Sequence, residues 1–173
     1  WFNTSSKPLI VSCQEALERY NPDAIRLFFL SSHYRSGLTW SEEGVLAAER
    51  GVERLRSALR PPYGAEASPQ LAAKAQEARR AFQEAMDDDL NTAQALATLF
   101  DLAKVINQAR DEGSGGEGFA TAQETLRESA GILGLRLEGP KVRGAAIAPF
   151  IDLLIEIRDE LRRNKEYGLA DNI

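Results

Sequence analysis

The chain has 173 residues, 43% of them hydrophobic and 27% charged, which is close to the average of soluble globular proteins and excludes wholesale disorder. Its single cysteine, Cys13, excludes an internal disulfide and a cysteine-rich zinc site, and no apolar run approaches the roughly 18 residues that span a bilayer, so we expect a cytoplasmic protein without a membrane partner. The formal net charge of −5 argues against an autonomous, tight nucleic-acid binder, which usually carries a basic excess.

The first 14 residues predict an extended lead-in. The segment KPLIVSCQ (7–14) contains one short β-like run, bounded by Pro8 and by polar residues. Because the chain begins with Trp1 and not with methionine, we expect it to be processed or cut from a longer protein. Beyond the lead-in the pattern is helical, and residues 15–173 are expected to form a helical bundle.

A stop and restart signal separates a short helix over 15–20 from the next one. Asn21 provides an N-cap and Pro22 suits the first helical position, so a second helix is predicted from Ala24 to about Tyr34. Its inner face is expected to comprise residues at three- and four-residue spacing: Ile25, Phe28, Phe29 and Ser32. This face would bury aromatic side chains against neighbouring helices.

The helix predicted over 41–60 is long and amphipathic. Ser41 caps it, two glutamates in its first turn favour the positive end of the helix dipole, and Pro61-Pro62 ends it. Its inner face follows a 3-4-3-4 spacing: Val45, Ala48, Val52, Leu55 and Leu59.

The arginines of this helix fall on two sides. Arg50 and Arg54 are expected to point almost directly away from the core. The other two share a flank with glutamates that can neutralise them: Arg56 and Arg60, beside Glu49 and Glu53. Arg50 and Arg54 are therefore the arginines less readily neutralised, and a solvated helix surface is the commoner explanation of such a stripe.

Further helices are predicted along the rest of the chain. One opens at Ser68-Pro69 and runs to about Met86. Another is capped by Asn91 or Thr92, with an inner face of Leu96, Leu99, Ala103 and Ile106. After the glycine-rich segment 113–118, expected to be a flexible connector, the helical pattern runs from about Thr121 to 131–134. The last predicted helix carries an apolar stripe: Phe150, Leu153, Leu154, Ile157 and Leu161. The fold class is all-α, an antiparallel helical bundle of about five substantial helices.

Three features could indicate chemistry. His33 is the single histidine, so a His pair and a His-rich metal site are excluded. A helix-end role is favoured for it. The run DDD (87–89) could hold a cation, but no calcium-loop spacing follows it, and a cap-and-turn role is favoured. The glycines of 113–118 lack the preceding strand and the following Lys-Ser/Thr of a phosphate-binding loop. We therefore predict no catalytic, cofactor-binding or metal-binding residue in this chain.

Several motifs in order resemble one family. NPDAIRLFFLSSHYRS (21–36) resembles the segment that follows the catalytic domain of bacterial cysteinyl-tRNA synthetases, and its Asp23-Ala24-Ile25-Arg26 matches the Asp-Ala-Leu-Arg signature that names this class of helical domain. FQEAMDDDLNTAQALATLFDLAKVIN (82–107) resembles the family's Met-Asp-Asp-Asp-x-Asn-Thr helix start. RRNKEYGLADNI (162–173) resembles its Lys-Asp-Phe/Tyr…Ala-Asp-x-Ile stretch. The resemblance covers almost the whole chain.

The resemblance implies a bundle that docks on a tRNA stem within an enzyme that joins cysteine to tRNA. Its arginines would contact phosphates, so the candidate tRNA-contacting residues are Tyr34, Arg35, Arg50 and Arg54. Residues 1–60 hold eight Lys/Arg and seven Asp/Glu, so the first third is the less acidic part of the chain. Expected partners are tRNA, bound weakly in isolation, and the parent's catalytic domain, which would hold the ATP and zinc.

The sequence also departs from the family. The ATP-site loop Lys-Met-Ser-Lys-Ser is expected where the chain has Phe2-Asn3-Thr4-Ser5-Ser6, and both lysines, which would steady triphosphate, are missing. The His-x-Gly-His motif and the zinc ligands are also absent, so this fragment alone should be inactive. Two alternatives stay open: a synthetase-derived module that binds protein, and part of a ligase that joins cysteine to a small amine.

Overall fold

The computed structural model describes residues 12–64, 66–138, 155 and 157–158. The chain divides into two compact units, residues 1–137 and 138–173. The lead-in over residues 1–11 and the motif at 162–173 lie outside the described residues, as does the last predicted helix except for three helical positions, 155, 157 and 158.

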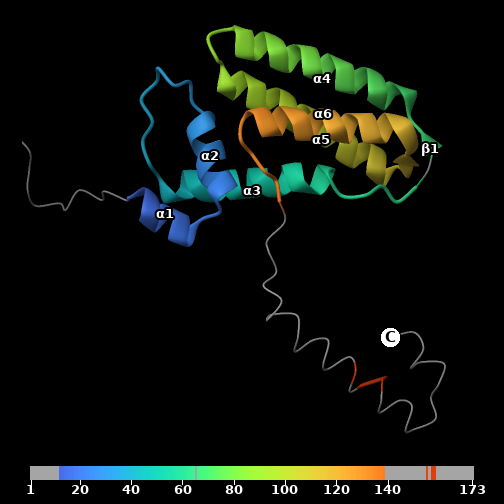
Figure 1. Ribbon diagram of the computed structural model, residues 1–173, viewed down its shortest axis with the longest axis horizontal. Helices are drawn as coiled ribbons and strands as arrows, with labels where there is room; N and C mark the ends of the chain where they lie inside the picture. The colour runs from blue at the N-terminus through green and yellow to red at the C-terminus, as the bar shows by residue number, and fades with distance from the viewer. Residues whose placement is uncertain (1–11, 65, 139–154, 156, 159–173) are drawn as a thin grey trace, which may run out of the picture. The chain divides into compact units, whose positions relative to one another are not determined.

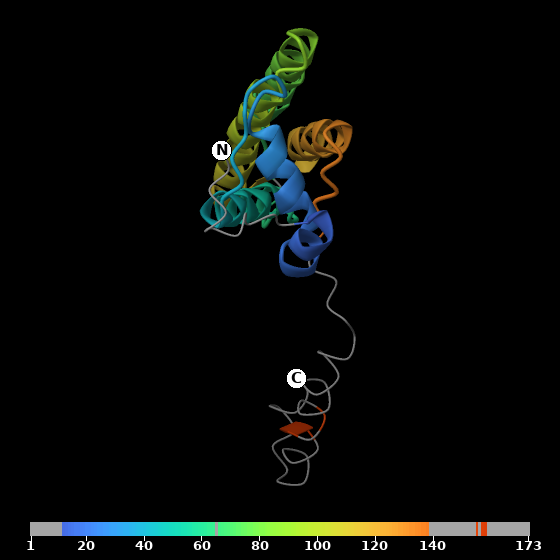
Figure 2. The same ribbon diagram turned by 90° about the vertical axis from the view of Figure 1, so that its left-hand side faces the viewer.

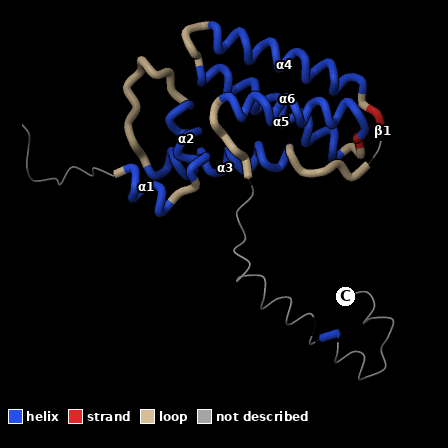
Figure 3. Tube along the Cα trace, in the orientation of Figure 1, coloured by secondary structure: helices blue, strands red, loops and turns tan. Residues whose placement is uncertain are grey.

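The first unit is all-α, which confirms the predicted fold class (Figures 1 and 3). Its described residues form six helices and one pair of two-residue strands: α1 (Cys13–Arg19), α2 (Pro22–Leu30), α3 (Glu42–Ala58), β1 (Glu66–Ala67), α4 (Pro69–Asp87), α5 (Thr92–Asp111), β2 (Ser114–Gly115) and α6 (Gly116–Ile132). Helices α4, α5 and α6 pack side by side, and α3 packs on both α5 and α2 (Figures 1 and 2). Within the described part of the chain, no helix has the combination of length and apolar character needed to cross a membrane.

Three of the predicted helix starts, those of α2, α3 and α5, are confirmed by capping bonds. Asn21 Oδ1 accepts a hydrogen bond from the backbone N–H of Asp23 at 2.9 Å, and Ser41 Oγ accepts one from Gly44 at 3.1 Å. Asn91 Oδ1 caps α5 in the same way, by accepting from the Gln94 N–H at 3.1 Å. Each cap satisfies a backbone donor that has no partner inside its own helix.

The core lies between the inner faces of α2 to α6. The predicted inner faces of α3 and α5 are buried at eight positions: Val45, Ala48, Val52 and Leu55, and Leu96, Leu99, Ala103 and Ile106. Leu59 is only half-buried, because α3 ends at Ala58. Phe119 of α6 is 1% exposed and has the largest fully buried side chain among the described residues. Alanines at many of the contacts let the helix backbones approach closely.

The predicted inner face and end of α2 are partly wrong. The buried apolar residues are Ala24, Leu27 and Phe28, whereas Phe29 is 51% exposed and lies beside Trp40, with 6.3 Å between ring centroids. The helix ends at Leu30 and does not continue to Tyr34. The reason is tertiary: the Thr92 hydroxyl, from the start of α5, donates to the Leu30 carbonyl at 2.9 Å.

The glycine-rich residues 113–118, expected to be a flexible connector, are instead ordered by a strand pair and the start of α6. β2 pairs in parallel with β1, with Glu66 opposite Ser114 and Ala67 opposite Gly115. Gly113 and Gly116 adopt φ of +82° and +71°, a region that glycine enters without steric cost. Helix α6 therefore begins about five residues earlier than the helical pattern predicts.

Gly118, in the first turn of α6, allows a close backbone approach. A Cβ at this position would lie 2.5 Å from the Ser68 carbonyl oxygen, next to the start of α4. We therefore expect Gly118→Ala to lower the free energy of unfolding by roughly 1–3 kcal/mol, because backbone atoms must move apart. The measurement is chemical denaturation followed by circular dichroism.

Gly131 of the same helix is the matched control. A Cβ there meets nothing within 4 Å, so Gly131→Ala should leave stability unchanged or raise it by up to about 1 kcal/mol through helix propensity. Equal effects of the two substitutions would contradict the close approach at Gly118.

Candidate nucleic-acid interface

Arg50 and Arg54 lie on the exposed side of α3, as the helical pattern predicts. Neither guanidinium forms an ion pair with any residue in the described part of the chain. The Arg54 guanidinium lies over the Phe100 ring of α5, with its Cζ 5.3 Å from the ring centroid. Both arginines border a groove of about 580 Å³ that α2 and α3 line together with Phe100. This face combines two uncompensated cations with an aromatic ring.

The other two arginines, Arg56 of α3 and Arg60 just beyond its end, are paired, but only one of them as expected. Arg60 binds Glu53 at 2.9 Å, which is one of the predicted glutamates. Arg56 instead turns inward and forms an ion pair with Asp23 of α2, with 3.6 Å between Nη2 and Oδ2. Its side chain is only 15% exposed. The expected flank pairing of Arg56 is therefore wrong, because the start of α2 lies within its reach.

Asp23, the first residue of the Asp-Ala-Ile-Arg signature, is a buried structural clamp. Its carboxylate accepts hydrogen bonds from two consecutive backbone N–H groups beyond α6, Arg136 at 3.1 Å and Leu137 at 2.9 Å. Together with Arg56, these donors compensate a carboxylate in a residue that is 6% exposed. Asp23 thereby ties the chain after α6 to both α2 and α3.

Arg26, the last residue of the signature, packs against the same segment. Its guanidinium lies over Gly134, which has φ of +72° and follows the end of α6, and any Cβ there would overlap it. Among the residues that the structure describes, Arg26 forms no ion pair with a carboxylate. The charged residues of the signature therefore hold residues 134–137 in place.

Tyr34 and Arg35 lie at the surface after α2, and both bind Asp89. The Tyr34 hydroxyl donates to Asp89 Oδ1 at 2.8 Å. Arg35 Nη2 donates to the same oxygen at 3.1 Å, and its Nε lies 3.1 Å from Oδ2. His33 Nε2 is 3.8 Å from Oδ2, and its ring stacks on Tyr34 with 4.7 Å between centroids. We call His33, Tyr34, Arg35 and Asp89 the Asp89 cluster.

The run of aspartates at 87–89 has the predicted turn role. Asp87 ends α4, Asp88 is its C-cap, and Asp89 and Leu90 follow with φ of +52° and +54°. Within the described ranges, no group of three or more His, Cys, Asp or Glu side chains is placed to hold a metal ion. The contact between Asp89 and the segment after α2 was not predicted, since 55 residues separate Asp89 from Tyr34.

Arg110 is a buried cation that the sequence analysis missed. It is 7% exposed, and its guanidinium donates to the Ser57 carbonyl near the end of α3. Its Cζ also lies 5.6 Å from the centroid of the Tyr63 ring. Arg110 therefore joins α5 to the end of α3 and is not available to a ligand.

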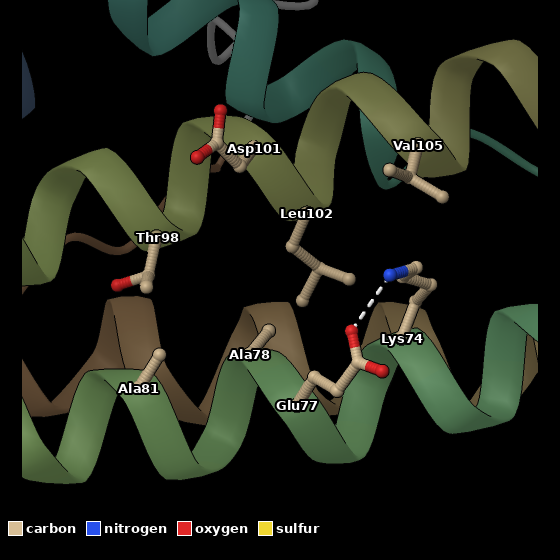
Figure 4. A pocket seen from close by; sticks show the side chains of 8 residues that line it. All are labelled: Lys74, Glu77, Ala78, Ala81, Thr98, Asp101, Leu102 and Val105. Carbon is tan, nitrogen blue, oxygen red and sulfur yellow. Dashed lines mark hydrogen bonds and ion pairs between the residues drawn. The ribbon is translucent and has the colours of Figure 1, made fainter.

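A second groove, between α4 and α5, lacks any such convergence of cations (Figure 4). It measures about 300 Å³, and half of the residues that line it are apolar, including Leu102 and Val105. Lys74 donates to Glu77 at its rim at 2.7 Å, and this hydrogen bond lowers the pKa of the Glu77 carboxyl. Because these charges neutralise each other, the face of α3 is the better candidate for binding a polyanion.

Comparison with known proteins supports the motif-based resemblance. Residues 81–138 match the family described as DALR domain. The chain is 46% identical over 169 residues to a cysteine–tRNA ligase of Dehalococcoides mccartyi strain 195, covering 95% of this chain and 35% of the relative. The corresponding ligase of Alkalilimnicola ehrlichii is 40% identical, covering 92% of this chain and 35% of the relative. That of Thermococcus gammatolerans is 36% identical, covering 94% of this chain and 37% of the relative.

These matches confirm the resemblance to cysteinyl-tRNA synthetases along nearly the whole chain. The chain spans about a third of the length of the curated relatives it matches. The matched DALR region begins near the end of α4 and contains the α4–α5 turn, α5, α6 and the segment that Asp23 holds.

The clamp makes a direct prediction. Asp23→Asn should lower the free energy of unfolding by about 1–3 kcal/mol, because it removes a hydrogen-bonded buried charge and leaves Arg56 buried without its partner. Hydrogen exchange at the Arg136 and Leu137 amides should also accelerate. Both quantities are measured on the 173-residue chain.

Asp101, exposed on α5, provides the control. Asp101→Asn makes the same chemical change and should alter stability by no more than about 0.5 kcal/mol. If Asp23→Asn behaves like Asp101→Asn and the two amides stay protected, Asp23 is not the clamp.

Proposed function

Because the chain is similar over 95% of its length to about a third of a cysteine–tRNA ligase, we propose that it is the tRNA-docking helical module of such an enzyme. The module itself carries no catalytic residue and acts by positioning the RNA. The parent would be cytoplasmic and would activate cysteine with ATP and transfer it to tRNA. The single observation that carries the RNA-docking part of the proposal is the uncompensated pair Arg50 and Arg54 on α3.

The chemistry of this face suits a phosphate backbone. An exposed guanidinium without a carboxylate partner can form charge-assisted hydrogen bonds with phosphate oxygens without first breaking an ion pair. The two arginines are four residues apart on one helix, and so lie on the same side of it, about one turn apart. Contacts of this kind position an RNA without reading its bases.

Tyr34 and Arg35 are a second candidate contact, of a different character. Their side chains are accessible, since Tyr34 is 62% exposed and the Arg35 side chain 67%. The charge of Arg35 is already compensated by Asp89, however, so Arg35 is the weakest of the three candidate cations in the free chain. We therefore assign the larger share of phosphate binding to Arg50 and Arg54.

The ATP and zinc expected of the parent enzyme do not fit the described residues of this chain. The described part contains no cluster of potential metal ligands, and its single cysteine, Cys13, is exposed on α1. We assign both cofactors to the catalytic domain of the parent, which would also be the protein partner of this module.

The test is equilibrium binding of the chain to cysteine-specific tRNA and to an unrelated tRNA across a salt series. We expect dissociation constants in the micromolar range or weaker that rise with salt, because phosphate contacts release condensed counterions. Arg50→Glu and Arg54→Glu should each weaken binding several-fold and reduce the slope of log K against log salt by about one.

Arg80→Glu is the matched control. Arg80 is exposed on α4, which packs mainly on α5 and α6, and the substitution makes the same change in net charge. Similar losses in all three variants would indicate a general charge effect and no specific face. Absence of binding by the unaltered chain at low salt would overturn RNA docking by the module and favour a role in protein packing.

A further inference from the structure

Three donor side chains from one short segment converge on a single carboxylate in the Asp89 cluster. Tyr34 and Arg35 both bind Oδ1, while Arg35 Nε and His33 Nε2 face Oδ2. Arg35 Nε also donates to the Tyr34 hydroxyl at 2.9 Å, which ties the donors to one another. A guanidinium and a hydroxyl arranged around a pair of anionic oxygens are also the groups that bind a phosphate.

The carboxylate in this cluster is held in place by the turn that carries it. Asp89 and Leu90 both have left-handed backbone conformations, which are unfavourable for non-glycine residues and persist where the surroundings impose them. The backbone N–H groups of Leu90 and Asn91 donate back to the end of α4, at the carbonyls of Met86 and Ala85. The turn thus presents Asp89 as a fixed anion to the segment after α2.

The internal ion pair is weak enough for an external anion to displace it. The side chains of Arg35 and Asp89 are 67% and 47% exposed, so solvent reaches both partners. Exposed ion pairs contribute only about 0–1 kcal/mol, whereas a phosphate diester brings a full negative charge and further charges nearby on the same strand. An incoming phosphate also reaches the donors without unfolding any helix.

We propose that Tyr34 and Arg35 form a phosphate-binding site that Asp89 occupies in the free chain, so that Asp89 acts as an internal competitor of the ligand. Identifying the natural ligand as a tRNA phosphate rests on the function proposed above, whereas the existence of the anion site does not. Asp89 thereby lowers the affinity of this surface for polyanions in general and restricts its use to ligands that also engage other cations.

Asp89→Asn is the informative substitution. It removes the competing charge, keeps an acceptor for the Tyr34 hydroxyl, and suits the left-handed backbone, which asparagine adopts more readily than most residues. The control is Asp87→Asn, which makes the same change in net charge two residues away, at the end of α4, where the side chain is exposed. The two variants differ in whether they release Arg35.

The first arm measures tRNA affinity at low salt. Asp89→Asn should raise the affinity about 2- to 5-fold more than Asp87→Asn does, which corresponds to releasing one exposed ion pair. In an Arg35→Gln background the two aspartate variants should be equal, because no guanidinium remains to be released. Equal affinities of Asp89→Asn and Asp87→Asn in the unaltered background would overturn the proposal.

The second arm uses inorganic phosphate and tests, without RNA, whether the anion site exists. The Arg35 side-chain Nε–H resonance of Asp89→Asn should shift saturably with phosphate, at concentrations at which Asp87→Asn and the unaltered chain respond less. Absence of this shift overturns the anion site. If the shift is present and no variant binds tRNA, the anion site stands and the proposed RNA function fails.

Discussion

The carboxylate of Asp23 connects parts of the chain that no other described residue joins in this way. It lies at the start of α2 and pairs with Arg56 of α3. It also accepts hydrogen bonds from the backbone N–H groups of Arg136 and Leu137, which follow α6. A buried carboxylate is unfavourable unless charges and donors surround it, so all three elements must be in place together. This requirement sets the path of the chain after α6, and Arg26 covers the same path at Gly134.

The clamp also shapes the outer surface of α3. Arg56 leaves the helix surface to reach Asp23, and Arg60 is bound by Glu53. Arg50 and Arg54 are then the arginines of α3 without an ion pair to a described residue. A chain with a formal charge of −5 can still present a local cationic face, because its carboxylates and guanidiniums are distributed by contacts of this kind.

The residues that carry the resemblance to cysteine–tRNA ligases are largely those that build the structure. Asp23, Ala24 and Arg26 of the signature hold or fill the junction of α2, α3 and the segment after α6. In the second motif, Asp87 to Asp89 make the α4–α5 turn, and Asn91 and Thr92 cap helix ends. A strong family resemblance therefore says much about the fold, while the residues proposed to contact RNA depend on surface charge and accessibility.

Most of the helical framework could be predicted from the sequence, since helix starts and inner faces depend on residues three or four positions apart. Asn21, Ser41 and Asn91 cap helices as predicted, and the inner faces of α3 and α5 follow their spacing. The same local patterns placed Arg50 and Arg54 outside. Other features depend on partners that are remote in sequence. The end of α2 at Leu30 depends on Thr92, the strand conformation of residues 114–115 depends on pairing with β1, and the charge of Arg35 is compensated by Asp89. A local pattern carries no information about such partners, so only the tertiary structure decided which charges are compensated and which remain available to bind.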